Sequence, residues 1–474
     1  MNCNELIIVL KSDSGICLYH QIYEYIKNEI QKGKLKENEK LPSTRSLADF
    51  LQVARSTVNL SYEQLLSEGY IEARPQSGYY VCRLENLIEI VPVQSAKLEK
   101  AVPAEQKFSL DFSPNAIDMK EFPYNSWKRI NKSILTDANS EMFSLGAPQG
   151  DEELRETICD YIYAARGIKC AAEQIIIGAG NDYLLLLLEK ILGRNKVIAM
   201  ENPTYQRAYR IFKTFDYEVA AISMDEAGMI PKMLWESDAD IAYVMPSHQY
   251  PSGITMPIGR QTEILKWACD KENRYIIEDD YDSFFRYRGR PVPAFQSVDE
   301  YGKIIYISTF SKVIAPAIRI SFMILPESLL HVYRANYSFY SSSVSRIDQR
   351  ILNEFISKGY FARYLNKMRK IYRDKHDLLL RELEPVKNIF EITGTNAGLH
   401  IILKPKYKCK MSSRSIIDRM GQHGIRIYDI NDFMIANKAE SKNAAILFGY
   451  AALSHDEIIE GVKVFNEITL SNQA

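Results

Sequence analysis

A lysine flanked by hydroxyl side chains and followed by an arginine is the part of the sequence best suited to covalent chemistry. Lys312 ends the segment TFSK (309–312), which comes directly after an apolar run of strand character. Ligands bind at the carboxyl ends of strands in α/β sheets. Thr309 and Ser311 can donate hydroxyl groups to a phosphate, and Arg319 can pair with it as a charged fork. A lone lysine after a strand is ordinarily a surface residue, but these neighbours favour a Schiff-base lysine.

A carboxylate and a phenol follow an earlier apolar run. Asp279 stands at the end of the predicted strand 275–278, where a carboxylate can keep a pyridine nitrogen protonated. Tyr281 can hydrogen-bond a phenolic oxygen on the same ring. The acidic run 278–282 could instead be a solvated loop or a metal site, but no histidine accompanies it, which weakens the metal alternative. We expect no metal.

A small-residue turn and a tyrosine complete the set. The segment 178–182 opens a predicted helix, so Gly180 and Asn181 can present a helix N-terminus to a phosphate, although a simple tight turn would have the same sequence. Tyr205 could stack on an aromatic ring or belong to the core. A lysine, a ring-nitrogen carboxylate, a phosphate cradle and an aromatic lid are what pyridoxal 5′-phosphate requires. The sequence therefore predicts this cofactor.

The elements expected around these residues form an α/β domain over residues 108–474. Short, almost wholly apolar runs alternate with helical stretches, which is typical of a parallel sheet covered on both faces. Beyond about residue 343 helices dominate, and three later strands indicate a smaller α+β subdomain. The apolar runs are 175–177, 197–200, 241–245, 275–277, 304–307 and 320–325, and the later strands are 399–403, 425–428 and 446–450.

Residues 1–82 have the pattern of a winged helix-turn-helix. Apolar residues at helical spacing predict three helices, the second capped by Ser43, and β-prone segments around the turn 75–78 predict the wing. The third helix is then the one expected to enter the major groove of DNA. The residues expected at the DNA surface are Ser43, Thr44, Arg45, Arg55, Ser56, Thr57, Asn59, Tyr62, Gln76, Ser77 and Gly78.

Charge argues against strong DNA binding by one head alone. Residues 1–82 contain 9 Lys and Arg against 10 Asp and Glu, whereas DNA-binding domains are usually basic. Either two heads act together in a dimer, or the winged helix serves only as a protein-interaction module. Residues 83–107 lose helical periodicity and mix prolines with alternating charges, so we expect a linker there.

Composition narrows the class of protein further. The 474 residues carry a formal net charge of −1, so the overall field favours neither nucleic acid nor a membrane surface. The seven cysteines are dispersed without a C-x-x-C pair, which argues against a disulfide framework or a zinc site. No run approaches the roughly 20 apolar residues of a membrane span, and no secretory signal pattern is present. We expect a cytoplasmic protein without membrane contact.

Two parts of the chain resemble known families. The stretch LPSTRSLADFLQVARSTVNLSYEQLLSEGYIEARPQSGYYV resembles the GntR-type winged-helix head. The segments APQG, IIIGAG, MPSHQYPSG, IIEDDYDS, TFSK and NAGLH resemble a fold-type I aminotransferase over about residues 108–470. The fusion of the two is similar to the MocR family, and most of all to its GabR branch.

This resemblance implies a fold, a cofactor and partners. It implies a mostly parallel seven-stranded sheet with a smaller C-terminal α+β subdomain, pyridoxal phosphate, and a head-to-tail homodimer. Members of the family regulate genes of amino-compound or vitamin B6 metabolism, so operator DNA and a small amino compound are the expected partners. By resemblance the effector carboxylate contacts Arg207, and the cofactor contacts Tyr205, Asp279, Tyr281, Thr309, Ser311, Lys312 and Arg319.

Two departures from the family patterns concern carboxylate binding. The late strand 445–450 has no arginine to clamp a substrate carboxylate, a charge-assisted contact worth ~1.5–3 kcal/mol, and this favours a sensor over a turnover enzyme. Where relatives that read γ-aminobutyrate carry a second arginine stands Asp432, which would repel a carboxylate unless Arg426 compensates. We therefore expect an amine or amino-acid effector, held by Arg207 and Lys312, other than γ-aminobutyrate.

A third departure concerns the phenolic oxygen of the cofactor. Tyr250 replaces the asparagine that usually contacts this oxygen. Tyr281 or His248 could substitute for it, and His248 could equally be a satisfied loop histidine.

Three functions fit these observations. The sequence favours a transcriptional regulator that depends on pyridoxal phosphate and senses an amino compound through aldimine exchange at Lys312. An active aminotransferase with an autoregulatory head is one alternative. A DNA-binding protein whose body is a cofactor-free dimerisation scaffold is the other.

Overall fold

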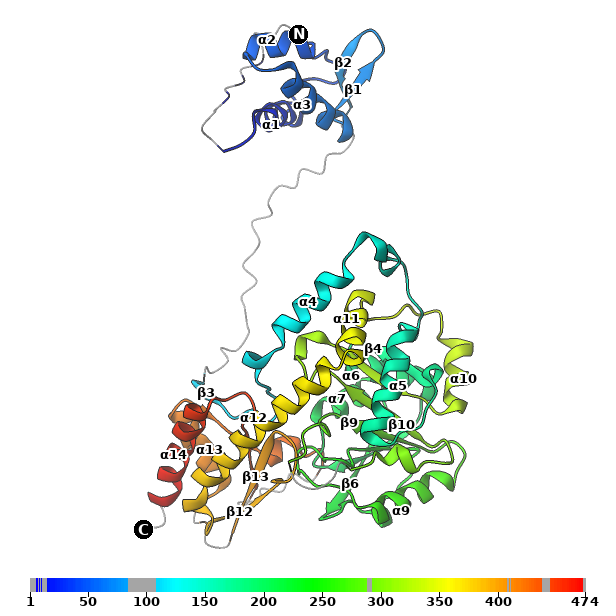
Figure 1. Ribbon diagram of the computed structural model, residues 1–474, viewed down its shortest axis with the longest axis vertical. Helices are drawn as coiled ribbons and strands as arrows, with labels where there is room; N and C mark the ends of the chain where they lie inside the picture. The colour runs from blue at the N-terminus through cyan, green and yellow to red at the C-terminus, as the bar shows by residue number, and fades with distance from the viewer. Residues whose placement is uncertain are drawn as a thin grey trace. The chain divides into compact units, whose positions relative to one another are not determined.

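The computed structural model describes residues 6, 8, 10, 15–83, 108–287, 292–406, 409, 411–436 and 444–471. The chain divides into two compact units, residues 1–105 and 106–474, called here the head and the body (Figure 1). The linker expected over residues 83–107 lies, from residue 84 onward, outside the described residues. Across the described segments, no helix has both the length and the apolar character needed to cross a membrane.

The head is a winged helix-turn-helix, as the sequence predicts. It consists of α1 (Leu18–Gln31), α2 (Thr44–Leu51), α3 (Arg55–Ser67) and an antiparallel hairpin of β1 (Ile71–Arg74) and β2 (Gly78–Val81).

Local signals define the turn between α2 and α3. Ser43 Oγ accepts a hydrogen bond from the Ser46 amide at 3.1 Å, so Ser43 caps α2 as predicted. Gln52 ends α2 in the left-handed conformation with φ +52°, and α3 begins directly after Ala54. The apolar sides of the three helices and of the wing share one core, which includes Ile22, Ile26, Leu47, Val58, Leu65 and Val81.

The body is built on a mostly parallel sheet of eight strands. Parallel pairing runs from β10 through β9, β8 and β5 to β6, and β11 is antiparallel to both of its neighbours. In spatial order the strands are β4 (Ile175–Gly178), β11 (Ser321–Ile324), β10 (Ile304–Thr309), β9 (Tyr275–Asp280), β8 (Ile241–Val244), β5 (Val197–Asn202), β6 (Glu218–Asp225) and β7 (Gly228–Met229).

The strand count differs from the expected seven by one short element. β7 contributes two residues that pair antiparallel with β6, and the other seven strands form the expected sheet. β6 is absent from the six apolar runs of the sequence because nearly all of its side chains are half-buried or exposed. Strands β4, β8, β10 and β11, by contrast, are buried at every position, and they coincide with apolar runs.

Helices cover the sheet and carry residues to its edge. α6 packs on β4, β10 and β11, and α7 packs on β6. The helices of this part are α4 (Tyr124–Ile134), α5 (Glu152–Arg166), α6 (Asn181–Leu192), α7 (Gln206–Thr214), α8 (Pro231–Glu236), α9 (Ile258–Cys269), α10 (Glu327–Asn336) and α11 (Arg346–Ser357).

A smaller C-terminal subdomain follows, as predicted. The long helix α12 (Tyr360–Glu382), yellow in Figure 1, packs on α11 and on α14 (His455–Ser471), so it joins the two parts of the body. An antiparallel sheet has the order β12 (Phe390–Thr393), β13 (His400–Pro405), β16 (Ile446–Gly449) and β15 (Tyr428–Asp429), with α13 (Ser413–Gln422) beside it.

One pairing links distant segments near the site. β3 (Leu110–Asp111), at the start of the body, lies parallel to β14 (Ile425–Arg426) in the small subdomain. The residues that directly follow β3 are thereby brought beside the small subdomain, and two of them line the cavity described below.

Candidate functional site

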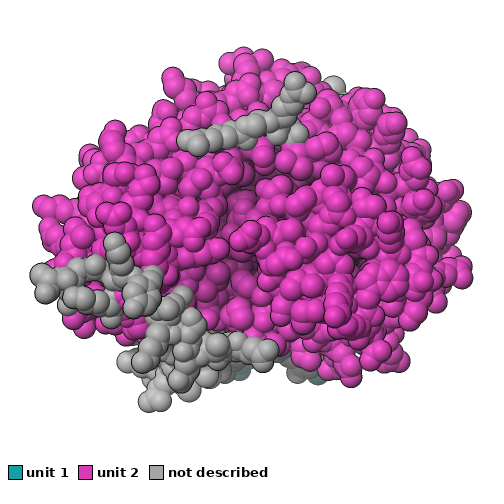
Figure 2. Space-filling view, turned by 90° about the horizontal axis from the view of Figure 1, so that it is seen from below, with its two compact units in different colours: residues 1–105 teal, residues 106–474 magenta. Residues whose placement is uncertain are grey.

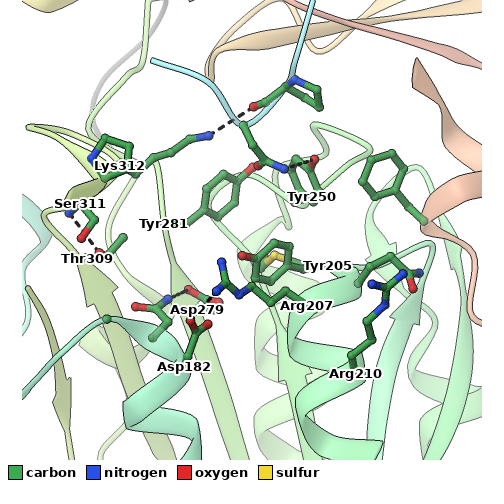
Figure 3. A pocket seen from close by; sticks show the side chains of 18 of the residues that line it. Asp182, Tyr205, Arg207, Arg210, Tyr250, Asp279, Tyr281, Thr309, Ser311 and Lys312 are labelled. Atoms are coloured by element: carbon green, nitrogen blue, oxygen red, sulfur yellow. Dashed lines mark hydrogen bonds and ion pairs between the residues drawn. The ribbon is translucent and has the colours of Figure 1, made fainter. Parts of the chain in front are cut away.

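A cavity of about 710 Å³ lies between the carboxyl ends of the parallel strands and the small subdomain. Figure 2 shows one face of the body hollowed near its middle, and Figure 3 shows side chains that line the cavity. All nine predicted cofactor residues line it: Gly180, Asn181, Tyr205, Asp279, Tyr281, Thr309, Ser311, Lys312 and Arg319. The predicted effector residues Arg207 and Asp432 line the same cavity.

Lys312 projects into this cavity from the segment after β10. Its Nζ donates a hydrogen bond to the Pro114 carbonyl at 3.3 Å. Burial disfavours the ammonium form and lowers the pKa of Lys312 to about 8, although the charge of Asp282 opposes this change. A substantial neutral fraction near neutral pH is what a nucleophilic lysine needs.

Asp279 is the next-to-last residue of β9 and lines the cavity. Its Oδ1 accepts a hydrogen bond from Asn181 Nδ2 at 3.2 Å, and its Oδ2 accepts one from the buried Tyr243 hydroxyl. Burial raises the pKa of Asp279 to about 7, the nearby Asp280 charge adds to this, and the Tyr243 hydrogen bond opposes it. A cationic ring nitrogen beside Asp279 would stabilise the carboxylate form, because opposite charges favour ionisation.

The groups expected to hold a phosphate meet at the N-terminus of α6. Gly180 has φ +88°, and a Cβ there would overlap the Arg319 guanidinium, so only glycine fits. Arg319 Nη2 donates to Asp182 Oδ2 at 3.0 Å. Ser311 Oγ is buried and has no hydrogen-bond partner within the described structure. An unpartnered hydroxyl, an arginine and a helix N-terminus together fit an anionic phosphate.

Tyr281 and His248 were the two side chains expected to contact the phenolic oxygen of the cofactor, and the structure places them differently. Tyr281 lines the cavity, whereas His248 lies behind it, with Nδ1 3.0 Å from Tyr281 Oη and 2.8 Å from Asp282 Oδ2. Tyr250 lines the cavity and accepts a hydrogen bond from Asn115 Nδ2 at 2.9 Å. His248 therefore contacts Tyr281, and Tyr281 is the group of the two that faces the cavity.

The late strand provides no cation to the cavity. β16 is buried at every position, and Phe448 packs edge-on against Phe112 with ring centroids 5.0 Å apart. A Cβ at Gly449 would overlap the backbone of Ser113. This strand thus serves packing, in agreement with the absence of arginine from its sequence.

Most of the residues expected to contact DNA lie at the surface of the head. Ser43, Arg45, Arg55, Ser56, Gln76 and Gly78 are exposed, and Thr57, Asn59 and Ser77 are half-buried. Tyr62 is a correction: its side chain is 0% exposed and its hydroxyl donates to the Pro42 carbonyl at 3.0 Å, so it belongs to the core. The Thr44 side chain is also buried, which leaves only its backbone for a phosphate contact.

Sequence reasoning missed several residues around the cofactor residues. Tyr243 lies inside β8 and has the sequence appearance of a core residue, so nothing marks its contact with Asp279. Asn115 comes from the segment after β3 and carries no local signal. Asp182 directly follows the predicted Asn181. An acidic residue beside a turn expected to bind phosphate was a signal in the sequence that a basic side chain lies nearby, and Asp182 does contact Arg207 and Arg319.

Comparison with known proteins agrees with this architecture. Residues 18–81 match the family model described as "Bacterial regulatory proteins, gntR family", and residues 108–460 match "Aminotransferase class I and II". An archaeal alanine:glyoxylate aminotransferase has a similar fold, with a TM-score of 0.67 and 23% identity over 76% of this chain and 91% of that one.

Relatives with both parts are named as transcriptional regulators. The uncharacterized regulator YdeL of Bacillus subtilis (strain 168) is 35% identical over 449 residues, 94% of this chain and 96% of YdeL. The probable rhizopine catabolism regulatory protein MocR of Rhizobium meliloti is 31% identical and covers 79% of this chain and 78% of MocR. The pyridoxine biosynthesis regulator PdxR of Corynebacterium glutamicum is 28% identical, with 96% of each chain covered.

The fold and the site define a class of protein: a GntR-type DNA-binding head fused to a body with the aminotransferase fold, which typically carries pyridoxal phosphate. The chain belongs to the MocR-type family of helix-turn-helix transcriptional regulators.

Proposed function

We propose that this chain is a transcriptional regulator that binds pyridoxal phosphate at Lys312 and responds to a small amino compound. One observation carries the proposal: Lys312, Asp279 and the unpartnered Ser311 hydroxyl, from separate points of the chain, face one cavity. When bound, pyridoxal phosphate supplies an aldehyde that condenses reversibly with primary amines.

The predicted cofactor and effector residues would then each have a task. Lys312 would hold the aldehyde carbon through its side-chain nitrogen, and Asp279 would keep a proton on the ring nitrogen. Arg319, Ser311 and the N-terminus of α6 would bind the phosphate, with Gly180 and Asn181 at that N-terminus. Tyr205 would stack on the ring, Tyr281 would bind the phenolic oxygen, and Thr309 would support the phosphate. Arg207 and Asp432 would face the effector.

The absence of a carboxylate clamp in β16 supports sensing rather than turnover. An active aminotransferase must orient its substrate for repeated proton transfer, and a missing charge-assisted contact costs about 1.5–3 kcal/mol and the associated orientation. An effector that exchanges with Lys312 only needs to bind. Binding of the effector would then change how the small subdomain closes on the sheet and how the two heads of a dimer bind operator DNA.

DNA binding and dimerisation are part of the same proposal. Arg55, Ser56 and Asn59 stand on the outer side of α3, where they can contact bases. The near-neutral head requires a second head for affinity, and the body carries exposed apolar side chains at Phe143 (71%), Leu145 (87%) and Phe339 (74%) that a head-to-tail homodimer would cover. The names of PdxR and MocR support targets in vitamin B6 or amino-compound metabolism.

Trapping the cofactor tests the central claim. Purified protein is incubated with pyridoxal phosphate, reduced with borohydride and digested, and mass spectrometry should place a phosphopyridoxyl group on Lys312. Lys312→Ala should lose both this adduct and the effector dependence of a footprint upstream of the protein's own gene. Reduction products on surface lysines alone, or an unchanged effector response in the alanine variant, would refute the proposal.

A further inference from the structure

Two cysteines of the body lie against each other although they are eleven positions apart in the sequence. Cys159 belongs to α5, and Cys170 belongs to the short segment that follows this helix. Their sulfur atoms are 3.5 Å apart, and Cys159 Sγ is also 3.7 Å from the Cys170 carbonyl oxygen. Both thiols are free. The fold therefore creates a close thiol pair that no C-x-x-C pattern of the sequence indicates.

The backbone between the two sulfurs permits a bond. Because a disulfide holds its sulfurs about 2.05 Å apart, the pair must approach by about 1.5 Å. Cys159 is held within α5, whereas residues 167–171 form neither helix nor strand. Gly167 ends α5 in the left-handed conformation with φ +74°. The sulfur on the irregular segment can therefore move toward the sulfur on the helix while α5 stays intact.

The pair lies where a small molecule can reach it. Both cysteines are half-buried and pack against the core of the body from its outer side. Asp160, Lys169 and Ala171, which flank them in the sequence, are exposed. Neither cysteine lines the cavity of the candidate cofactor site. The pair is thus a separate place on the body, accessible to a molecule as small as hydrogen peroxide.

A metal site is the alternative use of two neighbouring thiols. A structural zinc ion takes four protein ligands, and a catalytic one takes three. Among the residues that the structure describes, no group of three or more His, Cys, Asp or Glu side chains is placed to hold a metal ion. The pair is therefore better suited to thiol chemistry than to metal binding.

The contact between the sulfurs makes Cys159 the more reactive thiol. The hydrogen bond from Cys170 lowers the pKa of Cys159, and burial opposes this change. The same contact raises the pKa of Cys170, and burial adds to the rise. Because the thiolate and not the thiol attacks an oxidant, Cys159 is the sulfur that would react first, with Cys170 beside it as the second thiol.

We propose that Cys159 and Cys170 form a redox modification site that takes hydrogen peroxide as its oxidant. The Cys159 thiolate attacks one peroxide oxygen, the O–O bond breaks, and the hydroxide that leaves takes up the proton released by the thiol. The sulfenic acid formed on Cys159 is then attacked by the Cys170 sulfur. The S–O bond breaks, the disulfide forms and water leaves. In total, two thiols lose two electrons and two protons, and one peroxide becomes two waters.

The bond would constrain the end of α5 at a point that supports the main sheet. The closed ring would include Arg166, the last residue of α5, whose Nε lies 3.0 Å from Asp280 Oδ2. Both side chains of this ion pair are buried. The Arg166 carbonyl also accepts a hydrogen bond from the Ala294 amide at 3.0 Å. Oxidation would therefore act on the body at the base of β9, and a dithiol reductant would reverse it by thiol–disulfide exchange.

Peptide mapping tests the site. The reduced protein is treated with graded hydrogen peroxide, its remaining thiols are alkylated, and it is digested with trypsin without reduction. Trypsin cuts after Arg155, Arg166 and Lys169, so the disulfide joins peptides 156–166 and 170–190 into one product that mass spectrometry identifies. We expect this product at about tenfold lower peroxide concentration than any other disulfide, or less, because the second thiol is already beside the first. Dithiothreitol should remove it.

The other cysteines of the chain provide the contrary outcomes. Cys17 and Cys269 are exposed. Protein in which either of them is oxidised while Cys159 and Cys170 are still fully alkylated would overturn the proposal. Linkage of Cys159 to any cysteine other than Cys170 as the main product would also overturn it.

Single substitutions separate the roles of the two thiols. In Cys170→Ser no second thiol removes the sulfenic acid, so dimedone, which labels sulfenic acids, should label Cys159. In Cys159→Ser the labelling of Cys170 should be about tenfold lower at equal peroxide. Cys269→Ser changes an exposed cysteine at the end of α9 and should form the linked peptides like the wild type. Equal labelling in the first two variants would overturn the assignment of Cys159 as the attacking thiol.

Two features keep this test decisive. Circular dichroism shows whether each variant is folded, and Cys159→Ala and Cys170→Ala replace any serine variant that is not. None of the measurements needs cofactor, effector or DNA, so their outcome does not depend on the proposed function.

Discussion

Asn181 Nδ2 donates a hydrogen bond to Asp279 Oδ1 across 3.2 Å, and this contact ties the phosphate end of the cavity to its ring-nitrogen end. Asn181 is the first residue of α6, and Asp279 lies in β9 next to its carboxyl end. In the proposed cofactor site, Asn181 would present its backbone to the phosphate and its side chain to Asp279, and this would locate the two ends of the cofactor relative to each other.

Cofactor attachment should follow the titration of Lys312. The pKa near 8 means that about half of Lys312 is neutral and nucleophilic at pH 8, and that this fraction approaches completion about one pH unit higher. Stopped-flow absorbance of cofactor-free protein mixed with pyridoxal phosphate should give a rate that rises with pH, has its midpoint near pH 8 and then levels. In Asp282→Asn the rate should level at lower pH, because the Asp282 charge raises this pKa. A midpoint near the usual lysine pKa of ~10.4 would contradict the prediction.

Asp279 should make the stability of cofactor-free protein depend on pH. Its folded-state pKa of about 7 exceeds the unfolded value of ~3.9, so the folded state holds a proton that the unfolded chain has already released. The free energy of unfolding therefore falls as pH rises from about 4 to 7. Chemical denaturation should show a smaller fall in Asp279→Asn. Burial also raises the pKa values of Glu201 and Glu278 to about 7. These two residues therefore contribute to the pH dependence of the free energy of unfolding in both proteins.

The same variant should bind the cofactor less tightly. An amide cannot offset the positive ring nitrogen, and a lost charge-assisted hydrogen bond of about 1.5–3 kcal/mol corresponds to roughly a tenfold or greater loss of affinity. Equilibrium dialysis of Asp279→Asn against wild type measures this. Equal affinities would show that the ring nitrogen does not face Asp279.

Two glycines at the ends of α6 allow a controlled test of the phosphate turn. Gly180 and Gly193 have nearly the same backbone angles, φ +88° with ψ 167° and φ +81° with ψ 169°. Alanine at either position should cost about 1–3 kcal/mol of backbone strain. A Cβ at residue 193 meets nothing within 4 Å, whereas one at residue 180 displaces Arg319. Only Gly180→Ala should therefore weaken phosphate and cofactor binding, measured by calorimetry.

Two residues of α3 should separate folding of the head from DNA contact. Tyr62→Phe leaves the Pro42 carbonyl without this hydrogen bond and should lower head stability by about 1–3 kcal/mol. Asn59→Ala should leave stability within about 0.5 kcal/mol and weaken specific DNA binding, as expected for a base contact. Thermal unfolding and gel-shift titrations on the same samples provide both readings. Specific DNA binding unchanged in Asn59→Ala would remove this residue from the interface.

Local sequence determined a large part of this protein. The Ser43 cap acts within a few residues of itself, and the hydroxyls beside Lys312 and the small-residue turn at Gly180 are local patterns, so all three could be located in the order of side chains. Fully buried strands such as β4, β8, β10 and β11 must be apolar throughout, and they could be located for that reason. The half-buried β6 could not, because partial burial leaves a mixed sequence.

Tertiary structure alone decided which distant residues share a partner. Asp182 contacts Arg207 and Arg319 at once, and Tyr243 reaches Asp279 from the neighbouring strand. Arg210 and Arg426 face one cavity although more than two hundred positions separate them in sequence. Tyr62 belongs to the core. The packing of α3 decides which of its sides is buried, and the sequence of α3 alone does not show this. Such contacts depend on how the sheet, α7 and the small subdomain are placed relative to one another. No local sequence pattern specifies this placement.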